Sequence, residues 1–327
     1  MIRALLLCCA VAGALQPPPM TAGVTGLGAE SDFTLTREFT AFEASERFGE
    51  LYEAGLETVR RRDERARALR TVLDERAVID AVWPTIAASG EEAAAASPVL
   101  APALRRIVAH ASLPAGLAEN LAARLADGDV GRGPLAEALR SNLESSADAL
   151  ARDLLAIVDA DPARPSPLTA FLHFKGFLAL ATHRAAAALW SNRDGDAGAE
   201  HLALYLQGRA SSVFGVDIHP GATVGSGVFI DHGTGVVIGE QATVGDGCYL
   251  LHGVTLGATG KVKRGKRHPT VGAGVTLGSG ASVLGPVIVG DGATVGANAC
   301  VTKDVAAGAT VIDTSFMNNR ILAPKRK

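Results

Sequence analysis

Aromatic residues, cysteines and an excess of either charge are scarce in this sequence of 327 residues. The four cysteines fit neither a disulfide framework nor a cysteine-based zinc spacing, because two are adjacent near the N-terminus and the others lie far apart. Lysine and arginine total 31 against 34 aspartates and glutamates, so no net field attracts the chain to nucleic acid or to an anionic membrane. Small molecules and proteins are therefore the expected partners.

Apolar runs are also short. Residues 4–15 are small and aliphatic, follow a single arginine and precede a proline-rich break, which is the pattern of a secretory signal peptide. This run is too short to span a bilayer comfortably, and no later stretch predicts a membrane span. Residues 16–29 contain no acid, as in the second part of a bipartite plastid address. Residues 1–29 are interpreted as a targeting segment for the plastid, with the secretory route and the cytoplasm left open.

The rest of the chain has two different periods. From about residue 35 to 208 it is rich in alanine, leucine, arginine and glutamate at helical spacing, which predicts a helical domain over residues 30–212. Beyond residue 213, aliphatic residues recur at every sixth position in three groups, and many of them precede a glycine. They are Ile218, Val224, Ile230, Ile238, Val244, Leu250, Leu256, Val271, Leu277, Val283, Val289, Val295 and Val301.

A period of six predicts a left-handed parallel β-helix over residues 213–310. Each turn of such a coil has three short strands that send one aliphatic side chain inward, with glycine where the chain bends sharply. A β-sandwich would instead show alternation broken at irregular spacing. The predicted fold class is α+β, with an N-terminal all-helical domain, a left-handed parallel β-helix built of hexapeptide repeats, and a tail over residues 311–327.

The period breaks at two places, and both interruptions carry a histidine. The step from Ile230 to Ile238 is eight, so two extra residues are expected to bulge outward between them. The step from Leu256 to Val271 is fifteen, so a longer loop leaves the coil there. Residues that leave a rigid coil are free of packing constraints, and functional groups gather on such loops, although each histidine taken alone fits a surface or capping role better than a functional one.

The motifs around these interruptions resemble the serine O-acetyltransferase family, whose members transfer the acetyl group of acetyl-CoA to L-serine in cysteine biosynthesis. The resemblance covers about residues 155–310. It rests on the segments 216–220 (VDIHP), 231–235 (DHGTG), 253–257 (GVTLG), 267–269 (RHP), 161–163 (DPA), 167–168 (PL) and 174–177 (FKGF).

The resemblance implies roles for individual residues. His232 matches the general base that takes the proton of the serine hydroxyl, and Asp217 matches its orienting carboxylate. The matches to serine-binding residues are Asp161 and Asp231 for the ammonium, Arg267 for the carboxylate, and His268 as a second imidazole. Acetyl-CoA is the implied co-substrate, with no permanently bound cofactor. The matches to its contacts are Gly257, Ala258, Thr259, Ser279 and Ala297.

The chemistry of these residue types suits that reaction. An alcohol attacks a thioester efficiently only when a base removes its proton, and neutral imidazole near pH 7 is suited to the task. A carboxylate on the other ring nitrogen fixes the tautomer. A zwitterionic substrate requires acids for its ammonium and a guanidinium, which grips a carboxylate at two points.

Two other activities fit the coil. An acetyltransferase for a sugar or another hydroxyl acceptor would not need the Asp161, Asp231 and Arg267 set. A γ-type carbonic anhydrase holds zinc with three histidines, and His252 follows Leu250 as His232 follows Ile230, so the two imidazoles should stack. No third histidine has the expected short spacing, so no metal site is predicted.

The resemblance also implies assembly into a homotrimer or a dimer of trimers, with active sites between subunits. Family members dock O-acetylserine sulfhydrylase through a flexible tail that ends in isoleucine. This chain instead reads VIDTSFMNNR over residues 311–320 and ends at Lys327, so the sequence gives no basis for expecting that complex.

Overall fold

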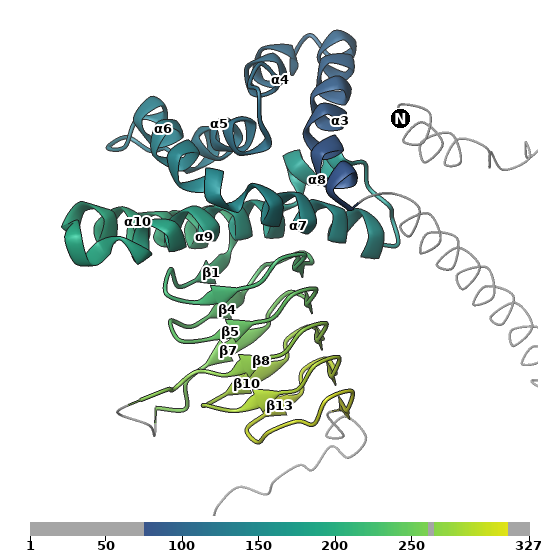
Figure 1. The fold of residues 1–327 in the computed structure, drawn as a ribbon, viewed down its shortest axis with the longest axis vertical. Coiled ribbons are helices and arrows are strands. Elements are labelled where there is room, and N and C mark those ends of the chain that lie inside the picture. The colour runs from purple at the N-terminus through teal and green to yellow at the C-terminus, as the bar shows by residue number, and fades with distance from the viewer. Residues whose placement is uncertain (1–74, 261–264, 313–327) are drawn as a thin grey trace, which may run out of the picture. The chain divides into compact units, whose positions relative to one another are not determined.

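A computed structural model describes residues 75–260 and 265–312, and within these ranges a layer of helices precedes a coil of short strands (Figure 1). The predicted targeting segment and the tail beyond Ile312 lie outside the described residues. The helices are α3 (Glu75–Ala96), α4 (Ala101–Val108), α5 (Leu113–Leu125), α6 (Arg132–Leu143), α7 (Ala147–Ala160), α8 (Pro167–His173), α9 (Lys175–Ser191) and α10 (Ala197–Phe214). None of these described helices has the length and apolar character that crossing a membrane requires.

Local sequence signals set several helix ends. Ser166 accepts a hydrogen bond from the backbone N–H of Thr169 at 3.1 Å at the start of α8, and Asp196 accepts one from Gly198 at 2.8 Å at the start of α10. Such side chains satisfy N–H groups that have no partner inside the helix. Gly215 ends α10 with φ +70°, a conformation that glycine adopts without strain. The chain therefore turns at this glycine from the helices into the coil.

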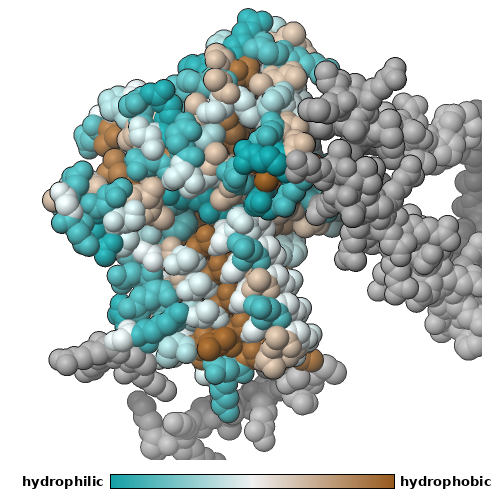
Figure 2. Space-filling view, in the orientation of Figure 1, coloured by the Kyte–Doolittle hydropathy of each residue, from teal (hydrophilic) through white to brown (hydrophobic). Residues whose placement is uncertain are grey.

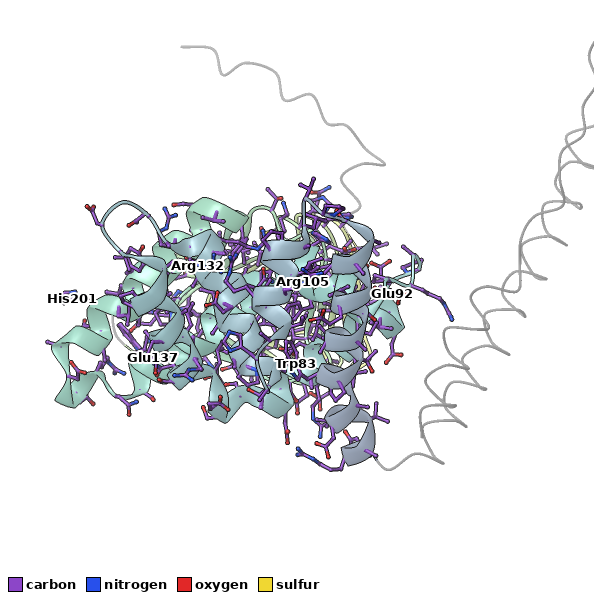
Figure 3. The ribbon with its side chains drawn as sticks, turned by 90° about the horizontal axis from the view of Figure 1, so that it is seen from above. Trp83, Glu92, Arg105, Arg132, Glu137 and His201 are labelled. Atoms are coloured by element: carbon purple, nitrogen blue, oxygen red, sulfur yellow. The ribbon has the colours of Figure 1, made fainter. Side chains whose placement is uncertain are left out.

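The helical layer has an apolar interior and a charged exterior. Trp83 of α3 packs on Phe171 of α8 with ring centroids 5.9 Å apart, and its indole N–H donates to the backbone oxygen of His110. Figure 3 shows the layer from above, with Glu92 near one end and His201 at the other. The apolar spacing in the sequence thus places one continuous core beneath solvated faces.

The coil is a left-handed parallel β-helix, the fold class predicted from the six-residue period. Its strands form three parallel sheets: sheet A in the order β1-β4-β7-β10-β13, sheet B in the order β11-β8-β5-β2, and sheet C in the order β14-β12-β9-β6-β3. The strands are β1 (Val216–Ile218), β2 (Thr223–Val224), β3 (Phe229–Ile230), β4 (Val236–Ile238), β5 (Thr243–Val244), β6 (Tyr249–Leu250), β7 (Thr255–Gly257), β8 (Thr270–Val271), β9 (Thr276–Leu277), β10 (Ser282–Leu284), β11 (Ile288–Val289), β12 (Thr294–Val295), β13 (Cys300–Val301) and β14 (Thr310–Val311).

The register confirms the predicted period and both interruptions. Each aliphatic residue of the six-residue repeat lies in its own strand, β1 to β13, and all but Val224 are buried. Paired residues are 18 positions apart in a regular coil, as Ser282 and Cys300 are. The offset rises to 20 at the first interruption, as between β1 and β4, and to 27 at the second, as between β7 and β10. The extra residues therefore leave the coil without disturbing the pairing around them.

A buried ion pair joins the helices to the first turn of the coil. Arg184 of α9 donates through Nε and Nη2 to the two oxygens of Asp153 of α7, at 2.8 and 3.0 Å. The same guanidinium donates to the backbone oxygen of Gly225 at 2.7 Å, and the N–H of Val228 donates to Asp153 at 3.0 Å. Both side chains are almost fully buried. This clasp of Asp153 and Arg184 fixes the coil beneath α7 and α9.

Candidate active site

Two of the three corners of the coil carry the predicted site residues. The His232 corner contains residues 231–235, 251–254, 278–281 and 296–299, which connect sheet C to sheet A. The Arg267 corner contains the described residues 219–222, 239–242, 258–260 and 265–269, which lie between strands of sheet A and sheet B. A three-residue strand of sheet A separates the two corners in each complete turn.

The predicted bulge is present and turns His232 out of the coil. His232 has a left-handed backbone with φ +57°, followed by Gly233 at +69° and Gly235 at +78°. A residue with a Cβ is uncommon in this region and costs about 1–3 kcal/mol, so the surrounding contacts must hold it there. The side chain of His232 is 73% exposed, which leaves its imidazole open to a ligand.

The first turn of α9 holds the bulge in place. Gly176 lies so close to the coil that a Cβ there would stand 2.0 Å from the backbone oxygen of Ile230. Lys175 donates from Nζ to the hydroxyl of Thr234 within the bulge. Gly233 is also enclosed, since a Cβ there would lie 3.0 Å from the side chain of Val216. The shape of the bulge therefore depends on the helical layer as well as on the coil.

Asp231 lies beside the imidazole, and Asp161 acts with it on Tyr249. Asp231 is mostly buried, with Oδ1 at 3.8 Å from Nε2 of His232, while its Oδ2 accepts a hydrogen bond from the Tyr249 hydroxyl at 2.9 Å. Asp161 follows α7, and its Oδ1 accepts from the N–H of Ala163 at 2.8 Å. Burial, the bond to Asp231 and the charges of Asp231 and Asp161 raise the pKa of Tyr249 to about 12. Both predicted ammonium-binding acids therefore act on one phenol.

Three predicted site residues and His252 form a column down the His232 corner. His232, His252, Ser279 and Ala297 each lie two positions after the inward aliphatic residue of a sheet C strand, and those strands pair in register. The imidazoles of His232 and His252 meet edge to face with centroids 5.8 Å apart. The N–H of Gly280 donates to the backbone oxygen of His252 at 2.9 Å, which ties the next coil beneath. Two predicted coenzyme contacts thus line up below the predicted base.

The second group of predicted residues is held at the Arg267 corner. The backbone N–H of Arg267 donates to the side-chain oxygen of Gln241 at 2.8 Å, and its guanidinium lies 3.5 Å from Glu240. His268 is buried against Gly239, where a Cβ would stand 2.2 Å from the imidazole ring. The imidazole of His268 can therefore occupy this position because residue 239 is a glycine and has no side chain.

Both imidazoles at this corner favour the neutral form. Burial and the charge of Arg267 lower the pKa of His268, and burial lowers the pKa of His219. Nδ1 of His268 accepts a long bond of 3.4 Å from the Gln241 N–H, and Nδ1 of His219 accepts one of 3.0 Å from Gly221. When Nδ1 accepts, the proton of a neutral ring lies on Nε2. His268 can therefore donate a hydrogen bond from Nε2 without adding charge.

The remaining predicted residues lie on sheet A and at the Arg267 corner. Asp217 points outward from β1, where its Oδ1 accepts from the side-chain amide of Gln207 at 2.7 Å. It makes no ion pair with His232 within the described part of the chain. Gly257 ends β7, and its backbone oxygen accepts from the N–H of Gly285 at 2.9 Å. Ala258 and Thr259 follow it and are exposed.

One chain therefore brings the predicted residues together in two groups rather than one. Asp161, Asp231 and His232 gather at the His232 corner with Ser279 and Ala297, whereas Arg267 and His268 lie across sheet A with Gly257, Ala258 and Thr259. The sequence interpretation missed Tyr249, Glu240 and Gln241, which contact the predicted residues directly. For Tyr249 a signal was present, because Phe229 and Tyr249 are aromatic residues in equivalent positions of consecutive coils.

Among the described residues, no three histidine, cysteine, aspartate or glutamate side chains gather in a way that could hold a metal ion. His232 and His252 do lie on consecutive coils with their rings in contact, as the spacing predicts, but the rings meet edge to face. The coil register explains this contact.

A cavity of about 630 Å³ lies between α9 and the Arg267 corner. Its lining includes Trp190, Arg193, Glu240 and the buried His183. Nδ1 of His183 has no hydrogen-bond partner among the described residues, and burial with the charge of Arg184 lowers the pKa of His183 to about 3. The folded protein therefore keeps this imidazole neutral.

Phenylalanine in place of His183 is expected to reduce the sensitivity of the fold to acid. The unfolded chain takes up a proton on His183 near pH 6.5 and the folded protein does not, so this residue lowers stability as the pH falls below about 6.5. The free energy of unfolding of the variant should exceed that of the parent by about 1.4 kcal/mol more at pH 5.5 than at pH 7.5. Urea titrations at both pH values measure the difference.

Subtracting the free energy of unfolding of the parent from that of the variant cancels the contributions of groups that titrate in both proteins. Burial raises the pKa of Asp153 to about 6, and this group titrates in both the parent and the variant. If the stability difference between variant and parent is the same at both pH values, His183 takes up a proton in the folded protein as it does in the unfolded chain.

Two protein-family models match the chain. One is described as "Serine acetyltransferase, N-terminal" and matches residues 82–182, and the other is described as "Bacterial transferase hexapeptide (six repeats)" and matches residues 268–303. The chain is 50% identical over 239 residues to Probable serine acetyltransferase 4 of Oryza sativa subsp. japonica, covering 71% of this chain and 74% of that protein. Arabidopsis thaliana relatives include a mitochondrial serine acetyltransferase at 40% identity over 250 residues (75% of this chain, 62% of the relative) and a chloroplastic one at 41% over 209 residues (63% and 65%).

Solved structures give the same result for the fold. A serine acetyltransferase of Neisseria gonorrhoeae in complex with serine superposes with a TM-score of 0.67 at 39% identity, over 71% of this chain and 94% of that one. A serine acetyltransferase of Brucella abortus in complex with coenzyme A gives a TM-score of 0.67 at 40% identity, over 71% and 92%. The similarity extends across both the helices and the coil.

Proposed function

This chain belongs to the serine acetyltransferase family, and from that premise we propose which of its residues bind serine and carry out the transfer. The reaction moves the acetyl group of acetyl-CoA to the hydroxyl of L-serine, giving O-acetylserine and CoA. The observation that carries the assignment is the exposed imidazole of His232 on a bulge beside the carboxylate of Asp231.

Serine binds through both of its charges in this proposal. Asp161 and Asp231 hold the ammonium, because each has one oxygen fixed by the protein and the other directed away from that bond. Arg267 pairs with the carboxylate, and His268 donates to it from Nε2. Such a clamp favours an amino acid over a sugar, since a neutral acceptor gains nothing from paired charges.

His232 acts as the general base. Its neutral imidazole takes the proton of the serine hydroxyl as the oxygen attacks the thioester carbon, and the C–S bond then breaks to release CoA as a thiolate. The imidazolium returns the proton to this sulfur, so the base is regenerated and the atoms balance. Asp217 is proposed to orient the imidazole in the assembled site, since its Oδ1 is held by Gln207 while Oδ2 has no hydrogen-bond partner among the described residues.

Acetyl-CoA is proposed to lie along the corner below His232. Ser279 and Ala297 continue the column on the next coils, and Gly257, Ala258 and Thr259 supply backbone groups from the opposite corner. Backbone N–H groups at such turns can stabilise the developing oxyanion. No permanently bound cofactor is part of this mechanism.

A second copy of the chain is proposed to complete the site. The ammonium side and the carboxylate side lie on corners separated by sheet A, so serine bridges them when the His232 corner of one copy faces the Arg267 corner of another. Figure 2 shows apolar residues in a stripe over the visible face of the coil, and Val237 on sheet A is 40% exposed. Contiguous exposed apolar surface is typical of a contact face. A trimer or a dimer of trimers would repeat this contact around an axis.

Alanine in place of Arg267 is expected to raise the KM for serine by about 10- to 100-fold, the usual worth of a charge-assisted hydrogen bond, while the KM for acetyl-CoA changes less than about threefold. Steady-state kinetics with release of free thiol measure both constants. The reverse pattern would assign Arg267 to the coenzyme.

Mixing two impaired variants tests the shared site, with serine kept far below the raised KM of Arg267→Ala so that each variant turns over slowly when refolded alone. If each site takes His232 from one copy and Arg267 from another, unfolding and refolding His232→Ala and Arg267→Ala chains together restores some sites with both residues intact. Activity of the mixture should then exceed that of either variant refolded alone. No gain, with mixed oligomers present, would place both residues of a site in one chain.

We propose that residues 1–29 direct the protein to a plastid, since a plant relative is named as chloroplastic and another as mitochondrial. A full-length fluorescent fusion tests this, and a cytosolic signal would contradict it.

A further inference from the structure

Tyr249 lies at the proposed serine site and has no role in the mechanism above. It pairs in register with Phe229 of the preceding coil, and the two rings stack with centroids 4.9 Å apart and an interplanar angle of 16°. Phe229 is 2% exposed, so the ring beneath Tyr249 is fixed in the core. This stack directs the phenol hydroxyl along the coil surface to Oδ2 of Asp231, 2.9 Å away.

The phenol is a donor at every working pH. Burial and the neighbouring carboxylates raise the pKa of Tyr249 to about 12, so the hydroxyl keeps its proton. A carboxylate group can rotate about the bond that joins it to the rest of the side chain. A donor that is fixed on one of its two oxygens therefore selects one orientation of the group. With Oδ2 bound to Tyr249, Oδ1 of Asp231 faces the imidazole of His232 at 3.8 Å.

The two acids share one arrangement. Asp161 has Oδ1 bound by the N–H of Ala163, and Asp231 has Oδ2 bound by Tyr249. Neither remaining oxygen accepts a hydrogen bond within the described residues, although Asp231 is only 19% exposed. Each acid thus presents one fixed, unsatisfied oxygen, and an ammonium group has the N–H donors to satisfy both.

We infer that Tyr249 is a positioning residue for the amino group of the acceptor: it holds Asp231 so that Oδ1 meets the substrate ammonium beside His232. The inference rests on the proposed role of Asp231 in binding serine. Tyr249 touches neither the hydroxyl that reacts nor the thioester, so it acts on binding and orientation through Asp231.

Phenylalanine in place of Tyr249 tests this role, because it keeps the ring and the stack and removes only the hydroxyl. The KM for serine is expected to rise about 5- to 20-fold, the worth of a hydrogen bond to a charged group, while kcat stays within about threefold and the KM for acetyl-CoA within about twofold. Tyr205→Phe is the matched control. It removes a similar bond of 3.0 Å, from a phenol to Asp127, neither of which is a proposed site residue, and should leave all three constants unchanged.

The variants Asp231→Asn and Tyr249→Phe with Asp231→Asn separate the possible outcomes. If Tyr249 acts through Asp231, the double variant has the serine KM of Asp231→Asn alone, within about twofold, because the two changes are not additive. A serine KM unchanged by Tyr249→Phe, or raised by the same factor in both backgrounds, would overturn the inference and leave the role of Asp231 intact. A serine KM unchanged by Asp231→Asn would remove the proposed ammonium site itself, and the inference with it.

Discussion

Alanine in place of His232 is expected to lower kcat for acetyl transfer by about two to four orders of magnitude, the usual contribution of a general base. Among the described residues, the imidazole of His252 is the other one next to the bulge. Its ring contacts the ring of His232 and is not the one paired with Asp231. The binding of CoA should change little, because the column below the bulge is untouched. Initial rates at saturating serine and acetyl-CoA, with calorimetric titration of CoA, measure the two effects.

The backbone at His232 requires a second variant. Its φ of +57° disfavours alanine, so a loss of activity in His232→Ala could come from a collapsed bulge. Asparagine adopts left-handed conformations more readily and has no basic nitrogen, so His232→Asn should lose activity to the same extent. His252→Gln serves as the matched imidazole control and should retain activity within about fivefold. Near-normal turnover of His232→Asn would remove His232 from the proton transfer.

Asparagine in place of Asp153 is expected to lower the free energy of unfolding by about 3–5 kcal/mol, because it leaves the buried guanidinium of Arg184 without a counter-charge. Asp153 also accepts from the backbone of Val228, so the change loosens α7, α9 and the first turn of the coil together. Chemical denaturation at pH 7.5 and fixed protein concentration measures the loss.

Two controls separate the charge from the local packing. Asp148 pairs with Arg76 at the surface, where both side chains are more than half exposed, so Asp148→Asn should cost at most about 1 kcal/mol. Adding Arg184→Met to Asp153→Asn removes the unpaired charge and should restore part of the lost stability. If Asp153→Asn is as mild as Asp148→Asn, the clasp is not what binds the helices to the coil.

The fold of the coil followed from the sequence because its signal is local and repeated. The inward residue of every strand recurs at a fixed step, so the positions of β1 to β13 and of both interruptions could be read without knowing any distant contact. The same was not true of Arg184. Its partners Asp153 and Gly225 lie 31 and 41 residues away, and no periodicity links them, so no local pattern in the sequence indicates this ion pair.

The candidate site shows the same contrast between what is local in the sequence and what depends on distant contacts. The resemblance supplied the residue types and their roles, and these roles stay predictions. The resemblance did not reveal that the two groups lie on different corners. A motif specifies which residues are adjacent in sequence, but it does not specify the corner of the coil on which each group lies. Tyr249 escaped notice because an outward aromatic in a six-residue repeat is typical of an ordinary surface position, and only the stack on Phe229 and the bond to Asp231 distinguish it.

The column from His232 through His252 and Ser279 to Ala297 has a length set by the backbone. Neighbouring parallel strands lie about 4.8 Å apart, so three steps measure about 14 Å from the bulge downward. In the proposed binding mode, in which acetyl-CoA lies along this column, the coil sets how far the acyl donor extends. In that binding mode, a thioester with a long chain can contact the residues of every coil in the column, whereas a short one contacts only the first. The number of coils, more than any single side chain, then sets how far the donor extends.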